Sequence, residues 1–188
     1  SYEYRDKSKK ILNSENLENY SKKMSNIIKK VKSSTGIIYI FSEFIYSGLL
    51  PLALALEHEG FENLNKNLLN EKIDKKLFID NGKCVEFNKD KILPKANYIL
   101  LTGSLDGSDK NNKLIEDLIS EKNKSGEVVK IILGSLKTAE GLDFKRIREI
   151  HVLEPWYHFN RIEQVIGRGI RFCSHNSLIK EERNVTIY

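Results

Sequence analysis

The sequence predicts an α/β domain in which a parallel sheet is covered by helices on both faces. Short apolar runs rich in β-branched residues, typical of buried strands, alternate along the chain with longer segments of helical periodicity. Such alternation is the pattern of βαβ units and therefore of a parallel sheet. The expected strands are 37–41, 97–102, 128–133 and 149–153, and the expected helices are 17–31, 46–58, 109–122 and 158–172.

The N-terminal part of the chain is expected to be a linker and a helix (1–33), followed by one lobe (34–188). The first sixteen residues are polar, which favours a linker. Apolar residues then recur at helical spacing, with lysines between them, until the Ser33-to-Gly36 segment breaks the helix before the first strand. The segment 46–58 is apolar almost all round and predicts a buried helix that ends at Gly60.

Residues 61–96 are expected to be an insertion on this lobe. Two short apolar runs on either side of Asn81-Gly82 predict a β-hairpin, because these two residues favour a tight turn with positive φ. Farther along, Ser108 is a candidate N-cap for the helix 109–122. The last four residues, from Val185 to Tyr188, predict an edge strand.

The composition is that of an ordinary globular domain. The chain of 188 residues can bury a core, and its net charge of +5 permits nucleic-acid binding without conferring specificity. The longest apolar run, 49–56, is too short to cross a bilayer, and no signal-like N-terminus is present. Cys84 and Cys173 are expected to be reduced thiols of a cytosolic protein. The four histidines lack ligand spacing, so no metal is expected on this chain.

The segment from Gln164 to Arg171 carries the strongest chemical signal. In a helix, Gln164, Arg168 and Arg171 share one face, while Ile162, Val165, Ile166 and Phe172 lie on the neighbouring arc and suit burial against a sheet. A solvated polar face would explain the arginines as well. However, guanidinium groups held by a packed helix suit recognition of an anion, most simply a nucleoside triphosphate.

A loop of small residues follows the strand 128–133. Ser135 and Thr138 carry hydroxyls, Gly141 permits a close backbone approach, and Asp143 can accept a hydrogen bond from a ribose hydroxyl. Asp143 can equally be a turn or N-cap residue. Because ligands of open α/β sheets bind at the carboxyl ends of the strands, this loop is a candidate binding site.

These segments resemble the motifs of superfamily 2 helicases and translocases. The stretch from Ser135 to Asp143 looks like motif V, and Gln164 to Arg171 looks like motif VI (Q-x-x-G-R-x-x-R). Gly36 to Ser42 resembles motif IV, and Tyr98 to Ser104 matches a strand that ends in Thr-Gly-Ser in the most similar branch. That branch contains the helicases and early-transcription ATPases of poxviruses and giant DNA viruses. The resemblance covers about 36–60 and 97–172, and it implies the C-terminal one of two RecA-like lobes.

The resemblance also implies roles for individual residues. Arg168 and Arg171 resemble arginine fingers that reach ATP, and Gln164 would lie near the γ-phosphate. Gly141 and Asp143 resemble the nucleotide-contacting end of motif V. ATP with Mg²⁺ would be held mainly by an N-terminal helicase lobe of the same parent protein.

Nucleic acid is the second ligand that the resemblance implies. Ser135 resembles the motif V hydroxyl that contacts the nucleic-acid backbone, and Ser42 and Thr102 occupy comparable strand ends. Strand-end hydroxyls also cap helices, which is the alternative for all three. The implied partners are DNA or RNA and the transcription machinery, without a membrane, in the cytoplasm, a viral factory or a virion.

The sequence lacks the phosphate-cradling half of such a motor. It contains no G-x-x-x-x-G-K-[ST] segment and no Asp-Glu dipeptide that would hold magnesium. One lobe of a two-lobe motor, inactive by itself, is therefore expected. The alternative is a non-catalytic scaffold lobe in a viral transcription complex. Trp156 and His151 are both expected to be core residues, although Trp156 could also stack on a base or a partner.

Overall fold

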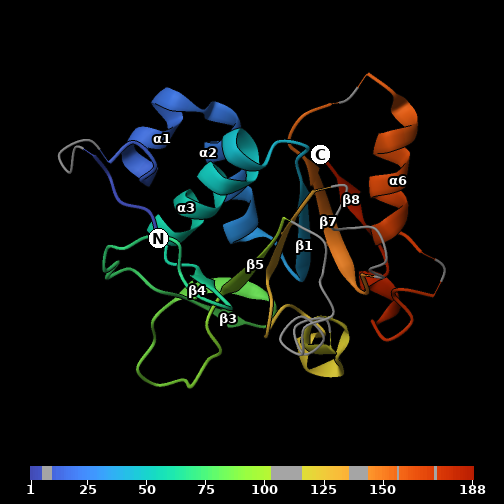
Figure 1. The fold of residues 1–188 in the computed structure, drawn as a ribbon. Helices are drawn as coiled ribbons and strands as arrows, with labels where there is room; N and C mark the ends of the chain where they lie inside the picture. The colour runs from blue at the N-terminus through green and yellow to red at the C-terminus, as the bar shows by residue number, and fades with distance from the viewer. Residues whose placement is uncertain (6–9, 103–115, 136–143, 156, 172) are drawn as a thin grey trace.

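A six-stranded parallel sheet forms the centre of the protein in the computed structural model (Figure 1). The structure describes residues 1–5, 10–102, 116–135, 144–155, 157–171 and 173–188. The spatial order of the strands is β2-β5-β6-β1-β7-β8, and every neighbouring pair is parallel. This confirms the predicted α/β class. The strands are β1 (Ile37–Phe41), β2 (Glu62–Asn63), β5 (Asn97–Leu101), β6 (Ile131–Gly134), β7 (Ile147–Val152) and β8 (Thr186–Ile187).

The central strand β1 divides the core between two faces. All five of its residues are buried, because helices cover both sides of the sheet. Ile38 and Ile40 join one apolar cluster with the N-terminal helices, whereas Ile37, Tyr39 and Phe41 join a second cluster that includes Val165 of the last helix. The resulting three layers, with α1 to α3 on one side and α6 on the other, give the RecA-like architecture (Figure 1).

The expected single helix at 17–31 is two helices. They are α1 (Ser14–Tyr20) and α2 (Lys22–Ser33), and they meet at Ser21, whose φ of -152° is extended. The Ser21 hydroxyl accepts a hydrogen bond from Met24 N at 3.2 Å, so this residue is the N-cap of α2. The prediction of one continuous helix was wrong because the apolar residues keep helical spacing across Ser21, although this serine is the N-cap of a second helix.

The expected helix at 46–58 is also built from two pieces. A π-helical turn, η1 (Ile45–Leu49), leads into α3 (Leu50–His58), and Pro51 lies in the first turn of α3. The α3 residues from Leu52 to Glu57 are buried, in accordance with the apolar run. Gly60 ends the segment with φ of 98°, a conformation that favours glycine.

The predicted hairpin within 61–96 is confirmed. Strands β3 (Leu77–Asp80) and β4 (Lys83–Glu86) are antiparallel, and their turn residues Asn81 and Gly82 have φ of 50° and 76°. The buried Lys130 ammonium fastens this turn to the lobe: it donates to the carbonyl oxygens of Ser34, Gly36 and Gly82 at 2.9, 2.6 and 2.6 Å. Three acceptors match the three donors of an ammonium group. That the segment is an insertion remains a prediction.

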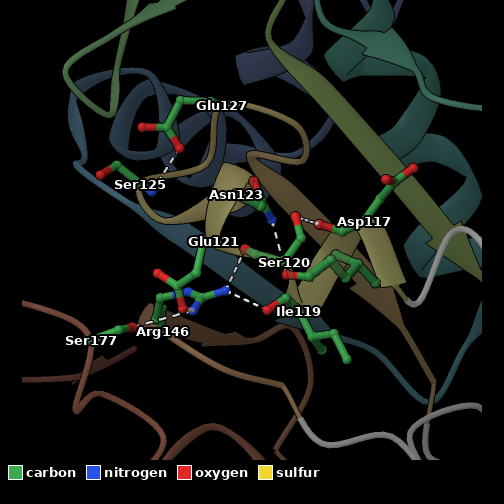
Figure 2. Close-up of polar contacts among 10 residues, drawn as sticks. Asp117, Ile119, Ser120, Glu121, Asn123, Ser125, Glu127, Arg146 and Ser177 are labelled. Atoms are coloured by element: carbon green, nitrogen blue, oxygen red, sulfur yellow. Dashed lines mark hydrogen bonds and ion pairs between the residues drawn. The ribbon is translucent and has the colours of Figure 1, made fainter.

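A buried arginine joins distant segments at the amino end of β7. Arg146 has φ of 62°, and its guanidinium donates to Glu121 Oε1, Ser177 Oγ and the carbonyls of Ile119 and Ser120 (Figure 2). Only the end of the predicted helix 109–122 lies within the described residues, as helical residues 116–119 followed by η2 (Glu121–Asn123).

Strand β6 begins three residues later than expected. The backbone amides of Val128 and Val129 donate to Asn123 Oδ1 at 3.1 and 2.9 Å, so they are not available for a sheet ladder. The C-terminal edge strand is confirmed as β8, which pairs with β7. Nowhere in the described part of the chain is a helix both long enough and apolar enough to cross a bilayer.

Candidate functional site

Three of the hydroxyl residues predicted as functional lie side by side at the carboxyl edge of the sheet. Ser42, Thr102 and Ser135 directly follow β1, β5 and β6, which are adjacent strands. Backbone hydrogen bonds connect these strand ends: Ser42 N donates to Gly134 O at 3.2 Å, and Ser135 N donates to Leu101 O at 3.4 Å. The structure therefore brings this predicted set together. Thr102 is half-buried, whereas Ser42 and Ser135 are buried.

Ser42 belongs to a hydrogen-bonded network at this edge. Its Oγ lies 2.7 Å from Glu154 Oε2 and 3.0 Å from Phe44 O, and it accepts from Phe44 N at 3.1 Å. Gly48 completes the packing, because a Cβ there would lie only 2.2 Å from Ser42 Oγ and 3.1 Å from Glu154 Oε1. The Ser42 hydroxyl thus positions the turn after β1. A ligand would reach this hydroxyl only if the network opened.

Glu154 is a site residue that sequence reasoning missed. It follows β7 and contacts a residue 112 positions away in the chain, so no local spacing could indicate the pair. The order of the strands could have done so, because β1 and β7 are neighbours and their carboxyl ends must meet.

The first turn of helix α6 (Phe159–Gly169) is attached to the same edge. Arg161 Nη1 lies 3.2 Å from Glu43 Oε1, and both side chains are partly exposed. This contact connects α6 with the turn after β1, beside the Ser42–Glu154 contact. An exposed pair of this kind adds little to the stability of the fold, but its geometry shows that the two segments lie next to each other.

The rest of α6 packs on the sheet through one face. Val165 is fully buried in the second apolar cluster, while Ile162 and Ile166 are half-buried, as the apolar arc predicts. Gly169 permits the close approach: a Cβ at this position would lie 2.7 Å from Ile150 Cδ1 and 3.5 Å from Ile147 Cγ2. Because Ile147 begins β7, the helix runs from the carboxyl edge towards the amino edge of the sheet.

The predicted arginine face and the strand-end hydroxyls therefore occupy different regions. Gln164 lies in the middle of α6 and is exposed, and Arg171 is exposed just beyond the helix end. Arg168 lies in the last turn of the helix, but its side chain is outside the described set. The candidate site therefore has two parts. One is the carboxyl edge of the sheet with its hydroxyl residues, and the other is the segment of α6 with the motif VI residues, which leads away from that edge.

Several predicted residues lie outside the described residues. They are Thr138, Gly141, Asp143, Trp156 and Phe172. His151 is described and is a core residue, as predicted: it lies 3.0 Å from Glu149 Oε2, and its ring stacks on that of Tyr188. Within the described ranges, no group of three His, Cys, Asp or Glu side chains gathers as a metal site would need.

The parallel sheet and its two helical layers define a RecA-like α/β lobe. Comparison with models of known protein families gives no match. Individual relatives, however, match most of the chain. A termination factor NPH-I homolog of African swine fever virus is 36% identical over 180 residues, which is 89% of this chain and 25% of the relative.

Two further relatives come from other viruses. A candidate ATP-dependent RNA helicase of Acanthamoeba polyphaga mimivirus is 32% identical over 173 residues, covering 92% of this chain and 26% of the relative. A candidate helicase of Invertebrate iridescent virus 3 is 30% identical over 169 residues, covering 88% and 15%. The chain is therefore a homologue of viral helicases and termination factors, which confirms the family that its motifs predict. It spans about a quarter of the length of the first two relatives.

Proposed function

We propose that the chain is the C-terminal RecA-like lobe of an ATP-dependent superfamily 2 helicase or nucleic-acid translocase. The observation that carries this proposal is helix α6. Val165 and Gly169 seat it on the sheet, and Gln164 and Arg171 remain exposed on the motif VI segment. A helix that is packed on the sheet and exposes its polar motif is suited to hold guanidinium groups in fixed positions.

The proposed chemistry is phosphoryl transfer to water between this lobe and an N-terminal one. ATP with Mg²⁺ would be held mainly by that other lobe. Arg168 and Arg171 would approach the transferred phosphoryl group, where they stabilise the charge that develops in the transition state. Gln164 would lie near the γ-phosphate, and Gly141 and Asp143 would contact the nucleotide. The lobe alone would be inactive because the magnesium ligands and the phosphate cradle are proposed to lie in the other lobe.

The carboxyl edge is the proposed nucleic-acid contact. Ser42, Thr102 and Ser135 lie on adjacent strands there, and hydroxyls at such positions suit hydrogen bonds to phosphate oxygens. Thr102 and Ser135 would contribute the hydroxyls at the ends of β5 and β6, and Ser42 would act after its network with Glu154 opens. The net charge of +5 and the names of the relatives, which include an ATP-dependent RNA helicase and a termination factor, support this role.

The test uses the full-length protein that contains this chain. Arg168→Ala and Arg171→Ala should each lower nucleic-acid-stimulated ATP turnover by about 10³- to 10⁵-fold, the range for an arginine that meets a transferred phosphoryl group. Nucleic-acid affinity should remain nearly unchanged, because the segment leads away from the carboxyl edge. Arg171→Lys should not restore turnover, since lysine lacks the planar fork of arginine.

The control is Arg5→Ala, which removes an exposed arginine near the N-terminus. Circular dichroism must show that each variant is folded. A folded Arg171→Ala protein with near-normal ATP turnover would refute the arginine-finger roles and favour a non-catalytic scaffold lobe in a viral transcription complex.

A further inference from the structure

Four large aromatic side chains are exposed near the carboxyl ends of β1 and β7. Tyr46 and Phe44 follow β1 and are 82% and 49% exposed, and Tyr157 and Phe159 follow β7 and are 97% and 67% exposed. We call these four residues the aromatic edge. Single exposed apolar residues are common on proteins, but several large rings gathered at one place indicate a binding surface.

Two contacts show that the two halves of the aromatic edge lie near each other. Ser42 Oγ lies 2.7 Å from Glu154 Oε2, and Glu43 Oε1 lies 3.2 Å from Arg161 Nη1. Phe44 and Tyr46 come shortly after Ser42 and Glu43 in the chain, while Tyr157 and Phe159 lie between Glu154 and Arg161. The four rings are therefore displayed from one rim of the sheet.

The backbone after β1 favours this display. Residues Ile45–Leu49 form a π-helical turn, a conformation that is rare and is often found at functional sites. Gly48 in this turn packs directly against Ser42 and Glu154, which leaves no room for a side chain there. Neither Tyr46 nor Phe44 belongs to either apolar cluster of the core. The backbone of the turn therefore carries these two rings outside the core.

Cationic side chains lie close to the same rim. The ammonium of Lys23, an exposed residue in the first turn of α2, donates to Leu153 O at 2.6 Å, immediately before Glu154. Lys22 beside it is exposed as well, and Arg161 contributes from α6. Exposed aromatic rings next to cations are the combination that binds single-stranded nucleic acid: the cations attract the phosphates, and the rings stack on the bases.

We propose that the aromatic edge stacks on unpaired bases of a nucleic-acid strand. This inference rests on the proposed function and adds to it, because the hydroxyl contacts proposed above reach only the backbone. Tyr46 and Tyr157 are the principal stacking residues, since they expose the largest fraction of their rings. Stacking of this kind tolerates any base sequence because every base has a π-face.

The test compares two oligonucleotides of equal length and charge, one with bases and one fully abasic. Binding of the full-length protein is followed by fluorescence anisotropy. The wild-type protein should bind the base-bearing strand more tightly. Tyr46→Ala and Tyr157→Ala should each raise the Kd for this strand by about 5- to 150-fold, as expected for loss of one stacked base. The Kd for the abasic strand should not change.

Two matched variants support this interpretation. Tyr46→Phe keeps the ring and should retain the preference for bases. Phe87→Ala removes another exposed ring, directly after β4 of the hairpin that is attached near the amino end of β1, and it should have no effect. Equal, salt-dependent affinity of the wild-type protein for both strands would overturn the stacking proposal but leave the proposed function intact.

Two other outcomes are equally decisive. If the wild-type protein binds neither strand, the proposed function fails together with the stacking proposal. If the tyrosine variants lose ATP turnover but keep the full preference for bases, the rings contact the other lobe, and the stacking proposal is overturned.

Discussion

Two buried carboxylates, Glu57 and Glu59, fix the chain around the end of α3. Glu57 accepts hydrogen bonds from the amides of Leu68 and Leu69 and from the Tyr98 hydroxyl, at 2.7 to 2.8 Å. Glu59 accepts from Lys32 at 2.8 Å and from Lys75 at 3.0 Å. Because an unpaired buried carboxylate is costly, these residues hold the following loop in one arrangement.

The buried Glu59 carboxylate should make the free energy of unfolding depend on pH. Burial alone would raise the pKa of this carboxyl, but hydrogen bonds from Lys32 and Lys75 outweigh burial and lower the pKa to about 2 from the ordinary 4.5. Between these two values the unfolded chain binds the proton more readily than the folded one. The contribution to folding is therefore complete above pH 4.5 and is lost as the pH falls through about 2.

Substitution of Glu59 by glutamine tests this contribution. We expect Glu59→Gln to lower the free energy of unfolding by about 1 to 3 kcal/mol at pH 7, with the difference from wild type shrinking towards pH 2. Urea unfolding at several pH values measures both quantities. Glu18→Gln, which removes an exposed carboxylate paired with Lys29, should have little effect at any pH. A constant difference across the pH range would contradict the assignment.

Two glycines in helix α6, two residues apart, have opposite packing requirements. A Cβ at Gly169 would lie 2.7 Å from Ile150 Cδ1, and Ile150 is fully buried and cannot move away easily. A Cβ at Gly167 would meet nothing within 4 Å among the described residues. Helix α6 can therefore approach the sheet closely only because position 169 lacks a side chain.

Alanine at each position should separate these effects. Gly169→Ala is expected to destabilise the fold by about 1 to 3 kcal/mol through overpacking. Gly167→Ala is expected to stabilise it by up to about 1 kcal/mol, because alanine favours an exposed helix. Chemical denaturation of the two variants gives the comparison directly. Equal effects of both substitutions would show that α6 does not pack on Ile150 in this way.

Secondary-structure elements were predictable where one local pattern dominates. The strand at 37–41 is identical in sequence analysis and structure, because a strand buried on both faces is apolar at every position. The hairpin turn was predictable from Asn81-Gly82 alone. The π-helical turn before α3 was missed, since its residues Ile45–Leu49 carry the same apolar pattern as an α-helix.

Long-range contacts limited the prediction of the site. The strand order could be anticipated only as a parallel sheet, yet it is this order that places Ser42 beside Glu154. The roles of Lys130 and Arg146 were equally hidden, because their partners lie 25 to 96 positions away. Sequence motifs indicated Gln164 and the arginines by type and spacing, and their catalytic roles remain predictions.

At the scale of the whole molecule, helix α6 lies between the two proposed binding regions. Its first turn contacts the carboxyl edge through Arg161, and its last residue, Gly169, lies over the amino end of β7. In the function we propose, nucleic acid at the carboxyl edge and ATP at the motif VI segment are therefore bound through different ends of one rigid element. Closure of two lobes on ATP would then move the edge that contacts the nucleic acid.

The 188-residue chain alone should bind nucleic acid but should not turn over ATP. Its net charge of +5 favours phosphate binding, which releases counterions, so the affinity should fall steeply as salt rises. Phosphoryl transfer needs a phosphate cradle and magnesium ligands, and the sequence contains neither a Walker-type segment nor an Asp-Glu pair. Anisotropy at two salt concentrations and a phosphate-release assay measure the two properties on the same preparation.

Binding that is insensitive to salt, or specific for one sequence, would contradict the electrostatic argument. Turnover that survives repurification and disappears in Arg168→Ala would instead refute the need for a second lobe, because a contaminating ATPase would not respond to that substitution.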